Sequence, residues 1–336
     1  MSQKENENLK KIIGRKKKNS PEKPKNIQNK IQYKKKENII VRMIYKLDKN
    51  SFIDNKYIIL LGEDFVSKNK NKFKIIISGK EYKMLSMIEV EKFEKYGINK
   101  KAETVTIELN GEKIDNISNM FNGCNSLIKV DFSKFNTENV IDMSYMFAYC
   151  GRLTEIDLSS FNTKSVKNLS SMFVGCEELI KVNLSKFVTQ KVKDMSYMFA
   201  YCKNLIEIDL SSFDTKNLKN LSGLLDGCES LIKVNLSNLS TQNIEDMSYL
   251  FRDCKSLIKV DLSSFNVKKV KSMTFMFASC KNLAKVNLSS FMVQKVTDVY
   301  EMFYNCESLV KVARKNCNRI KNYLGLERSK LSLIEI

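Results

Sequence analysis

The sequence predicts an α/β solenoid, with a parallel sheet on one face and short helices on the other, preceded by a small α+β capping domain. Three observations lead to this prediction. Eight of the nine cysteines, from Cys124 to Cys306, follow one another at intervals of 26 residues. Apolar residues recur at fixed distances from each of these cysteines. No apolar run approaches the ~20 residues that a membrane-spanning helix requires.

Each 26-residue unit contains one predicted strand. In the unit that follows Cys150, the segment Glu155-Ile156-Asp157-Leu158 alternates polar and apolar residues, which is the period of a β-strand. The same alternation recurs in the other units. We therefore expect the strands to stack in register as a parallel sheet, about 4.8 Å apart.

Each unit also contains a predicted short helix. Met143, Met146, Phe147 and Cys150 stand at i, i+3, i+4 and i+7, which places them on one face of a helix. Asp142 precedes this run, and its carboxylate can accept hydrogen bonds from the free N–H groups of a first helical turn. Equivalent residues occur in later units at Asn168, Asp194, Asn220 and Asp246.

The unit resembles that of the BspA-type leucine-rich repeat surface proteins of bacteria and protists. Their repeat is similar to F-N-T-x-x-V-x-D-M-S-x-M-F-x-x-C-x-x-L-x-x-L-D-L-S, and residues 135–159 follow this pattern closely. The resemblance covers residues 113–312. It implies a leucine-rich-repeat solenoid and, in many members, a cell-surface or adhesive role. This chain departs from those members because no secretory signal, wall anchor or membrane span is visible.

The cysteine ladder allows disulfides, a metal site or buried free thiols. Adjacent positions ~5 Å apart would permit disulfides. However, each cysteine closes an apolar face, where a thiol packs as a small hydrophobic group, and without histidine or a C-x-x-C motif a metal site has little support. Of seven N-x-Ser sequons, Asn183, Asn235 and Asn287 lie in the predicted strands, where a glycan would block the sheet. We therefore expect structural thiols in a reducing compartment.

Charged residues on the predicted strands form a candidate binding surface. Five residues after each cysteine, lysine and glutamate alternate as far as Glu207, and lysine then occupies every unit. Like charges on neighbouring strands repel and do not assist folding. We expect this lysine column, with Asp261 beside it, to receive an acidic partner, unless its side chains simply extend into water. The column consists of Lys233, Lys259, Lys285 and Lys311.

Tyrosines form a second period of 52 residues, at Tyr145, Tyr197 and Tyr249. Tyr149 and Tyr201 accompany the first two on the outward side of the predicted helices. These tyrosines could bind a partner, because tyrosine is favoured at interfaces. We prefer a packing role, in which they cover smaller residues of the intervening units. Those smaller residues are Ser171, Gly175, Gly223 and Gly227.

The regions outside the repeat divide into three predicted parts. Residues 1–40 contain 13 Lys and Arg against 4 Glu and both prolines, which is typical of a disordered basic arm. Residues 41–112 are expected to form the α+β cap, with strands at 39–47 and 57–61, a hairpin at 73–85 and a helix at 88–96. Residues 313–336 are expected to close the last repeat. Basic clusters in the arm are Arg15, Lys16, Lys17 and Lys18, and Lys34, Lys35 and Lys36.

The composition argues against catalysis. The absence of histidine excludes triads and metal sites that depend on imidazole, and neither a paired-carboxylate site nor a Gly-rich phosphate loop is evident. We expect no catalytic, cofactor or metal site, and a cytoplasmic scaffold that binds another protein on its strand face. One alternative is an adhesin-like surface protein exported without a recognisable signal. Another is a nuclear scaffold whose basic arm holds nucleic acid.

Overall fold

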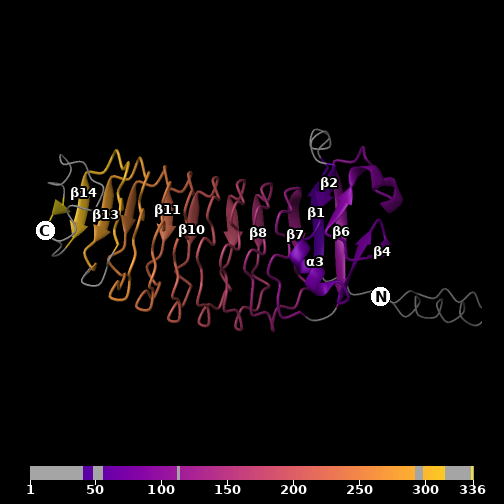
Figure 1. Ribbon diagram of the computed structural model, residues 1–336, viewed down its shortest axis with the longest axis horizontal. Helices are drawn as coiled ribbons and strands as arrows, with labels where there is room; N and C mark the ends of the chain where they lie inside the picture. The colour runs from indigo at the N-terminus through magenta and orange to yellow at the C-terminus, as the bar shows by residue number, and fades with distance from the viewer. Residues whose placement is uncertain (1–40, 48–55, 112–113, 292–297, 315–333, 336) are drawn as a thin grey trace, which may run out of the picture. The chain divides into compact units, whose positions relative to one another are not determined.

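The computed structural model describes residues 41–47, 56–111, 114–291, 298–314 and 334–335. The basic arm, including Arg15, Lys16–Lys18 and Lys34–Lys36, lies outside the described residues, as does most of the predicted C-terminal closing segment. The described chain forms a leucine-rich-repeat solenoid of the α/β class, as predicted (Figure 1).

An antiparallel sheet precedes the repeats. It contains β1 (Val41–Lys46), β3 (Phe73–Ile77), β4 (Lys80–Lys83) and β6 (Thr104–Gly111), in the order β4-β3-β6-β1. Alternate residues of β1 and β3 are buried, so these strands follow the two-residue period of a sheet with one covered face. The predicted hairpin between β3 and β4 is confirmed, and its turn places Ser78 and Gly79 at positive φ.

Four short elements complete this region. β2 (Tyr57–Ile59) pairs antiparallel with β5 (Met87–Glu89), and α3 (Glu63–Asn69) is the α-helix of the described residues. The 3₁₀-helices η1 (Val90–Lys92) and η2 (Glu94–Tyr96) follow β5. The helix predicted over residues 88–96 is therefore wrong at its start, because pairing with β2 holds its first two residues in a strand.

The repeat strands follow one per coil. β7 (Leu127–Asp131) pairs antiparallel with β1, so the first repeat strand extends the preceding sheet. Figure 1 shows the following strands side by side along the row of coils. They are β8 (Glu155–Asp157), β9 (Lys181–Asn183), β10 (Glu207–Asp209), β11 (Lys233–Asn235), β12 (Lys259–Asp261), β13 (Lys285–Leu288) and β14 (Lys311–Arg314), and β15 (Ile334–Glu335) pairs parallel with β14.

The short helices predicted opposite the strands are wrong: these segments are ribbons of consecutive turns. The N–H of Met143 donates to Asn168 O (3.1 Å) and that of Phe147 to Met172 O (2.8 Å), both in the next coil. Alternate N–H groups are thus unavailable to a helix, while the N–H of Met146 closes a turn onto Met143 O. Tyr145 lies at positive φ, which an α-helix also excludes. We call these segments the turn ribbons.

The turn ribbons nevertheless bury the residues predicted to share a helical face. Met143, Met146, Phe147 and Cys150 are fully buried. Asp142 accepts a backbone hydrogen bond as expected, from the N–H of Ser144 (2.9 Å), although at a turn rather than a helix start. Phenylalanines of successive coils stack, with ring centroids 5.3 Å apart between Phe147 and Phe173. The core is therefore a set of parallel columns of the same or similar apolar side chains.

Candidate functional site

The outward side of the strands carries two columns of polar side chains. In β9, β10 and β11 the middle residue packs against the core, while the flanking residues project outward. This division follows from the two-residue period of a strand. The first column contains Lys181, Glu207 and Lys233, and the second contains Asn183, Asp209 and Asn235.

The sheet is interrupted at a defined point in these columns. Parallel ladders join β8 to β9 and β10 to β11, whereas none joins β9 to β10, all of which lie in the described part of the chain. Within the first pair, the Asn183 side chain donates to Asp157 Oδ1 at 2.9 Å. These two pairs match the 52-residue period in the sequence, whereas β12, β13 and β14 form one continuous parallel ladder.

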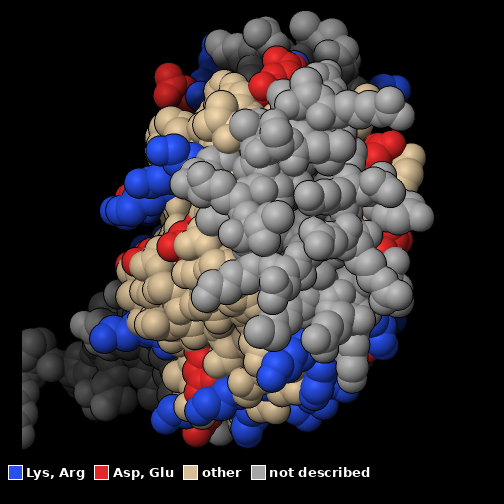
Figure 2. All heavy atoms as spheres, turned by 90° about the vertical axis from the view of Figure 1, so that its left-hand side faces the viewer, with Lys and Arg blue, Asp and Glu red and all other residues tan. Residues whose placement is uncertain are grey.

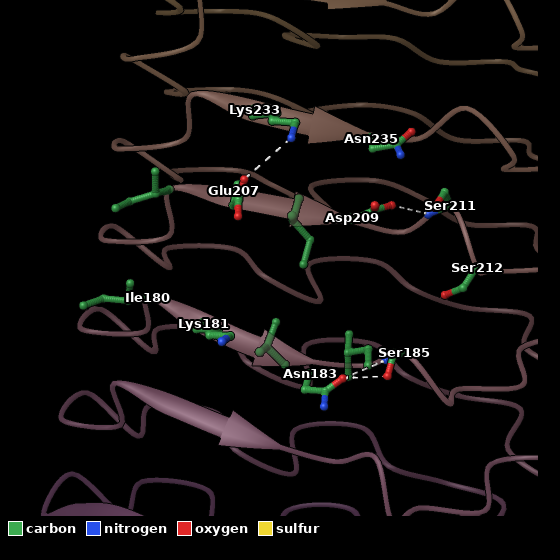
Figure 3. Close-up of a pocket in the computed structure, with 14 residues that line it drawn as sticks. Ile180, Lys181, Asn183, Ser185, Glu207, Asp209, Ser211, Ser212, Lys233 and Asn235 are labelled. Atoms are coloured by element: carbon green, nitrogen blue, oxygen red, sulfur yellow. Dashed lines mark hydrogen bonds and ion pairs between the residues drawn. The ribbon is translucent and has the colours of Figure 1, made fainter.

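A groove of about 670 Å³ lies over the interruption (Figure 3). Ile180, just before β9, lines one end, and Ser185 and Ser211 line the other. Ile206, just before β10, also lines the groove. The charged and amide side chains of the two columns stand between them. The groove thus offers apolar contact at one end and hydrogen-bonding groups along its length.

The groove contains charges of both signs. Glu207 Oε2 lies 3.8 Å from Lys233 Nζ, and both side chains are mostly exposed, so the pair contributes well under 1 kcal/mol to stability. Hydrogen bonds from Ser211 lower the pKa of Asp209, which keeps this carboxylate ionised at neutral pH. The groove therefore has no uniform potential.

The lysines of the predicted column lie in two different environments, one in the groove and the others on the strands beyond it. Lys233 lines the groove beside Glu207. Lys259 and Lys285 are register neighbours in β12 and β13, and the backbone of Lys311 is the next in register in β14. Asp261 accepts a hydrogen bond from Ser263 N (2.9 Å), so its carboxylate supports the turn after β12. Lys233 thus has a glutamate opposite it on the neighbouring strand, whereas Lys259 and the lysines after it do not.

An exposed isoleucine column beside the lysines was missed by the sequence interpretation. It lies one residue before each strand, and its side chains are between 47% and 55% exposed. These side chains are far more exposed than core residues. Because they occupy the same position in successive coils, they form one exposed apolar patch. The signal was present, because the residue four places after each cysteine is isoleucine in four consecutive units. These residues are Ile180, Ile206, Ile232 and Ile258.

The tyrosines on the turn ribbons pack as predicted. A methyl group added to Gly175 would lie 2.6 Å from the ring of Tyr149, and one added to Gly223 would lie 2.2 Å from the ring of Tyr197. Gly227 stands in the same relation to Tyr201. Each of these rings therefore covers a glycine of the next coil, where a side chain would collide with it.

The eight repeat cysteines are buried and free. The thiol of Cys176 donates to Phe147 O at 3.0 Å, and seven of the column make such a bond to the preceding coil. Burial raises the pKa of Cys176 to about 12. The structure therefore supports structural thiols over a disulfide ladder.

No group of three or more Cys, Asp or Glu side chains in the described ranges is arranged to hold a metal ion. Among the same residues, no helix has the length and apolar character needed to cross a bilayer.

The sequence and fold are similar to those of known repeat proteins. The family described as "Mycoplasma protein of unknown function, DUF285" matches residues 90–207 and again residues 202–316. The crystal structure of a leucine-rich repeat protein from Bacteroides ovatus is similar at 16% identity, covering 66% of this chain and 87% of that chain, with a TM-score of 0.24. No curated protein matches the sequence.

Proposed function

The chain belongs to the family described as Mycoplasma protein of unknown function, DUF285, whose description supplies no activity, and we propose that it is a non-enzymatic scaffold that binds an acidic, aliphatic segment of another protein on its strand face. The proposed surface extends from the groove over β9 and β10 to β13. It combines the isoleucine column with the lysines of β11–β13.

The isoleucine column is the observation that supports this proposal. Four isoleucines on successive coils each expose about half of their surface, although nothing in the fold requires a large apolar residue there. Fully burying one such side chain contributes roughly 1.5–3 kcal/mol. A partner that covered all four would therefore gain enough to offset part of the entropy lost on association.

The neighbouring lysines define the charge of the partner. Lys259 and Lys285 lie directly opposite one another in β12 and β13, and both are exposed. This arrangement destabilises the sheet slightly, and an acidic segment would relieve the repulsion while it buries its aliphatic side chains on the isoleucines. The surface therefore fits an extended chain with carboxylate and aliphatic groups.

A defined peptide tests the proposal. The probe is a fluorescent 12-residue peptide of alternating Glu and Ile, compared with an otherwise identical Lys and Ile peptide. We expect the full chain to bind the acidic peptide alone. The double variants Ile206→Ser/Ile232→Ser and Lys259→Glu/Lys285→Glu should each weaken that binding at least tenfold in fluorescence anisotropy.

A matched control separates this surface from net charge. The variant Lys167→Glu/Lys193→Glu carries the same charge change on another side of the coils and should bind the acidic peptide within threefold of the unmodified chain. Equal losses in both lysine variants would show that the attraction depends on overall charge. Binding that survives both strand-face variants would contradict the proposed site.

A further inference from the structure

A second charged surface lies on the loops between the strands and the turn ribbons. It comprises five segments, 164–167, 190–193, 216–219, 242–245 and 268–271, which we call the basic edge. These segments contain nine lysines and one acid, Glu245. All nine lysines are exposed, whereas the third residue of each segment, such as Val166 or Val192, is fully buried. Four of the five segments therefore place an apolar anchor inside and lysines outside, whereas segment 242–245 carries Glu245 in place of a lysine.

The lysines of the basic edge are held in register by the backbone. Lys193 N donates to Lys167 O at 2.9 Å, and Lys219 N donates to Lys193 O at 2.9 Å. Three lysines therefore occupy the same position in three consecutive coils. Like charges at this spacing oppose folding, so the arrangement is not explained by stability.

Few acids compensate this charge in the described residues. Lys271 pairs with Glu245 at 2.6 Å, and Lys216 pairs with Asp214 at 3.3 Å. Asp194, next to Lys193 in the chain, instead accepts hydrogen bonds from the N–H and hydroxyl of Ser196. The edge therefore keeps a large positive excess. At the C-terminal end of the coils, Figure 2 shows Lys and Arg side chains along the lower rim, with a few Asp and Glu side chains among them.

The chemistry of the basic edge favours a fluid anionic surface. Its five segments contain lysine but no arginine and no aromatic residue, so they lack the bidentate donors and stacking rings that nucleic-acid sites commonly use. Lysines in this arrangement act as separate point charges without a fixed partner geometry. Clusters of four to eight basic residues attract anionic lipid headgroups, at about 1 kcal/mol for each residue near the surface.

We propose that the basic edge holds the protein against an anionic lipid bilayer, which leaves the strand face available to its partner. The edge and the strand face are different sides of the same coils, so one coil can contact both at once. This inference does not depend on the strand face binding a protein.

Vesicle sedimentation tests the proposal. The full chain is mixed with vesicles of phosphatidylcholine alone, or with 30 mol% phosphatidylserine, at low and at physiological salt. We expect binding to the anionic vesicles alone, and binding that weakens with salt. Replacing Lys167, Lys191, Lys193 and Lys219 with Gln should lower the partition coefficient at least tenfold.

Two variants with the same loss of charge serve as controls. One replaces Lys181, Lys233, Lys259 and Lys285 on the strands with Gln, and should lower the partition coefficient less than threefold. The other replaces Arg15, Lys16, Lys17 and Lys18 of the arm with Gln. This arm variant should still bind the anionic vesicles through its intact basic edge. Adding the four edge substitutions to it should abolish binding. Unfolding midpoints at or above that of the unmodified chain would verify that the edge variant is folded.

Three results would overturn the proposal. The first is an absence of binding to anionic vesicles, and the second is an equal loss in the edge and strand variants. The third is a 20-base-pair DNA duplex that binds at least tenfold more tightly than the vesicles and displaces the protein from them, which would assign the edge to nucleic acid instead.

Discussion

Arg252 and Asp226 form a bidentate ion pair across two coils, with Nε to Oδ1 at 2.7 Å and Nη2 to Oδ2 at 2.6 Å. The Asp226 side chain is fully buried, whereas that of Arg252 is one third exposed. Arg252 also donates to the Tyr201 hydroxyl at 2.8 Å and lies 4.8 Å from the ring centroid of Tyr249. Burial raises the pKa of Asp226, and the hydrogen bonds from Arg252 oppose that shift.

The substitution Arg252→Ala should destabilise the protein by roughly 2–3 kcal/mol, because it leaves the Asp226 carboxylate buried without its partner. The double variant Asp226→Ala/Arg252→Ala should recover most of that loss. Other coils already place alanine at this position, as at Ala200 and Ala278, both of which are buried. Urea unfolding of the two single variants and the double variant measures the coupling, and additive losses would contradict a paired role.

The substitution Gly223→Ala should cost roughly 1–3 kcal/mol, since a methyl group there would lie 2.2 Å from the Tyr197 ring. The positive φ of 59° adds to the cost, although tyrosines at the same position in other coils also accept a positive φ. Combining Gly223→Ala with Tyr197→Ser should restore stability in thermal unfolding. A loss that persists in the double variant would assign the whole effect to the backbone.

The substitution Asp261→Ala should reveal an acid-sensitive contribution to stability. Hydrogen bonds from Ser263 lower the pKa of Asp261 in the folded state. A lowered folded pKa stabilises the protein above the unfolded pKa, near 4, and the contribution is lost as the pH falls through the folded value. The deficit of the variant should therefore be present at pH 7 and shrink below about pH 4.

A neutral counterpart provides the control for that measurement. Asn220 accepts the same kind of turn hydrogen bonds, from the N–H of Ser222 at 3.0 Å and from its hydroxyl at 2.8 Å, without carrying a charge. Asn220→Ala should lower stability equally at both pH values in urea titrations. A pH-dependent deficit in Asn220→Ala, or a constant one in Asp261→Ala, would contradict the assignment.

Alkaline unfolding should be steep because of the thiol column. Burial raises the folded pKa of Cys176 from 9.0 to about 12, and it also raises the pKa of the other six cysteines between Cys124 and Cys280. A raised folded pKa stabilises the protein below the unfolded value, and stability is lost as the pH rises beyond it. Each thiol contributes about 1.4 kcal/mol per pH unit in that window, so we expect unfolding soon after pH 9. Cys176→Ala should reduce the slope by about that amount in denaturant titrations between pH 8.5 and 10.

The buried positions of the repeat were predictable, whereas the conformation that buries them was not. Met143, Met146 and Phe147 are spaced as on a helix, and all are buried. Spacing of three and four residues is, however, also produced by consecutive turns whose N–H groups alternate between the same coil and the next. The choice depends on the carbonyls of the neighbouring coil, which a single unit of sequence does not contain.

The lysine column could be predicted from the sequence, because its charges recur in register. The isoleucine column was missed, because only the structure shows that its side chains are exposed. The lysines of β11–β13 follow directly from the repeat register. Ile206 and Ile232 read as ordinary apolar positions, because the sequence does not indicate that the chain turns there before the strand and leaves them outside. The nine lysines of the basic edge are spread over 108 positions of sequence, and the small net charge of the repeats conceals them.

The sequence by itself determined the 26-residue period, the strand of each coil, the buried cysteine column and the pairing of tyrosines with glycines, because these depend on residues that recur in register. The tertiary structure decided the turn ribbons, the interruption between β9 and β10, and the faces on which Ile206 and Lys193 lie. Those features arise from hydrogen bonds and contacts between coils. When the coils stack, residues 26 positions apart in the sequence become neighbours, and these columns of neighbouring side chains form the surfaces of the protein.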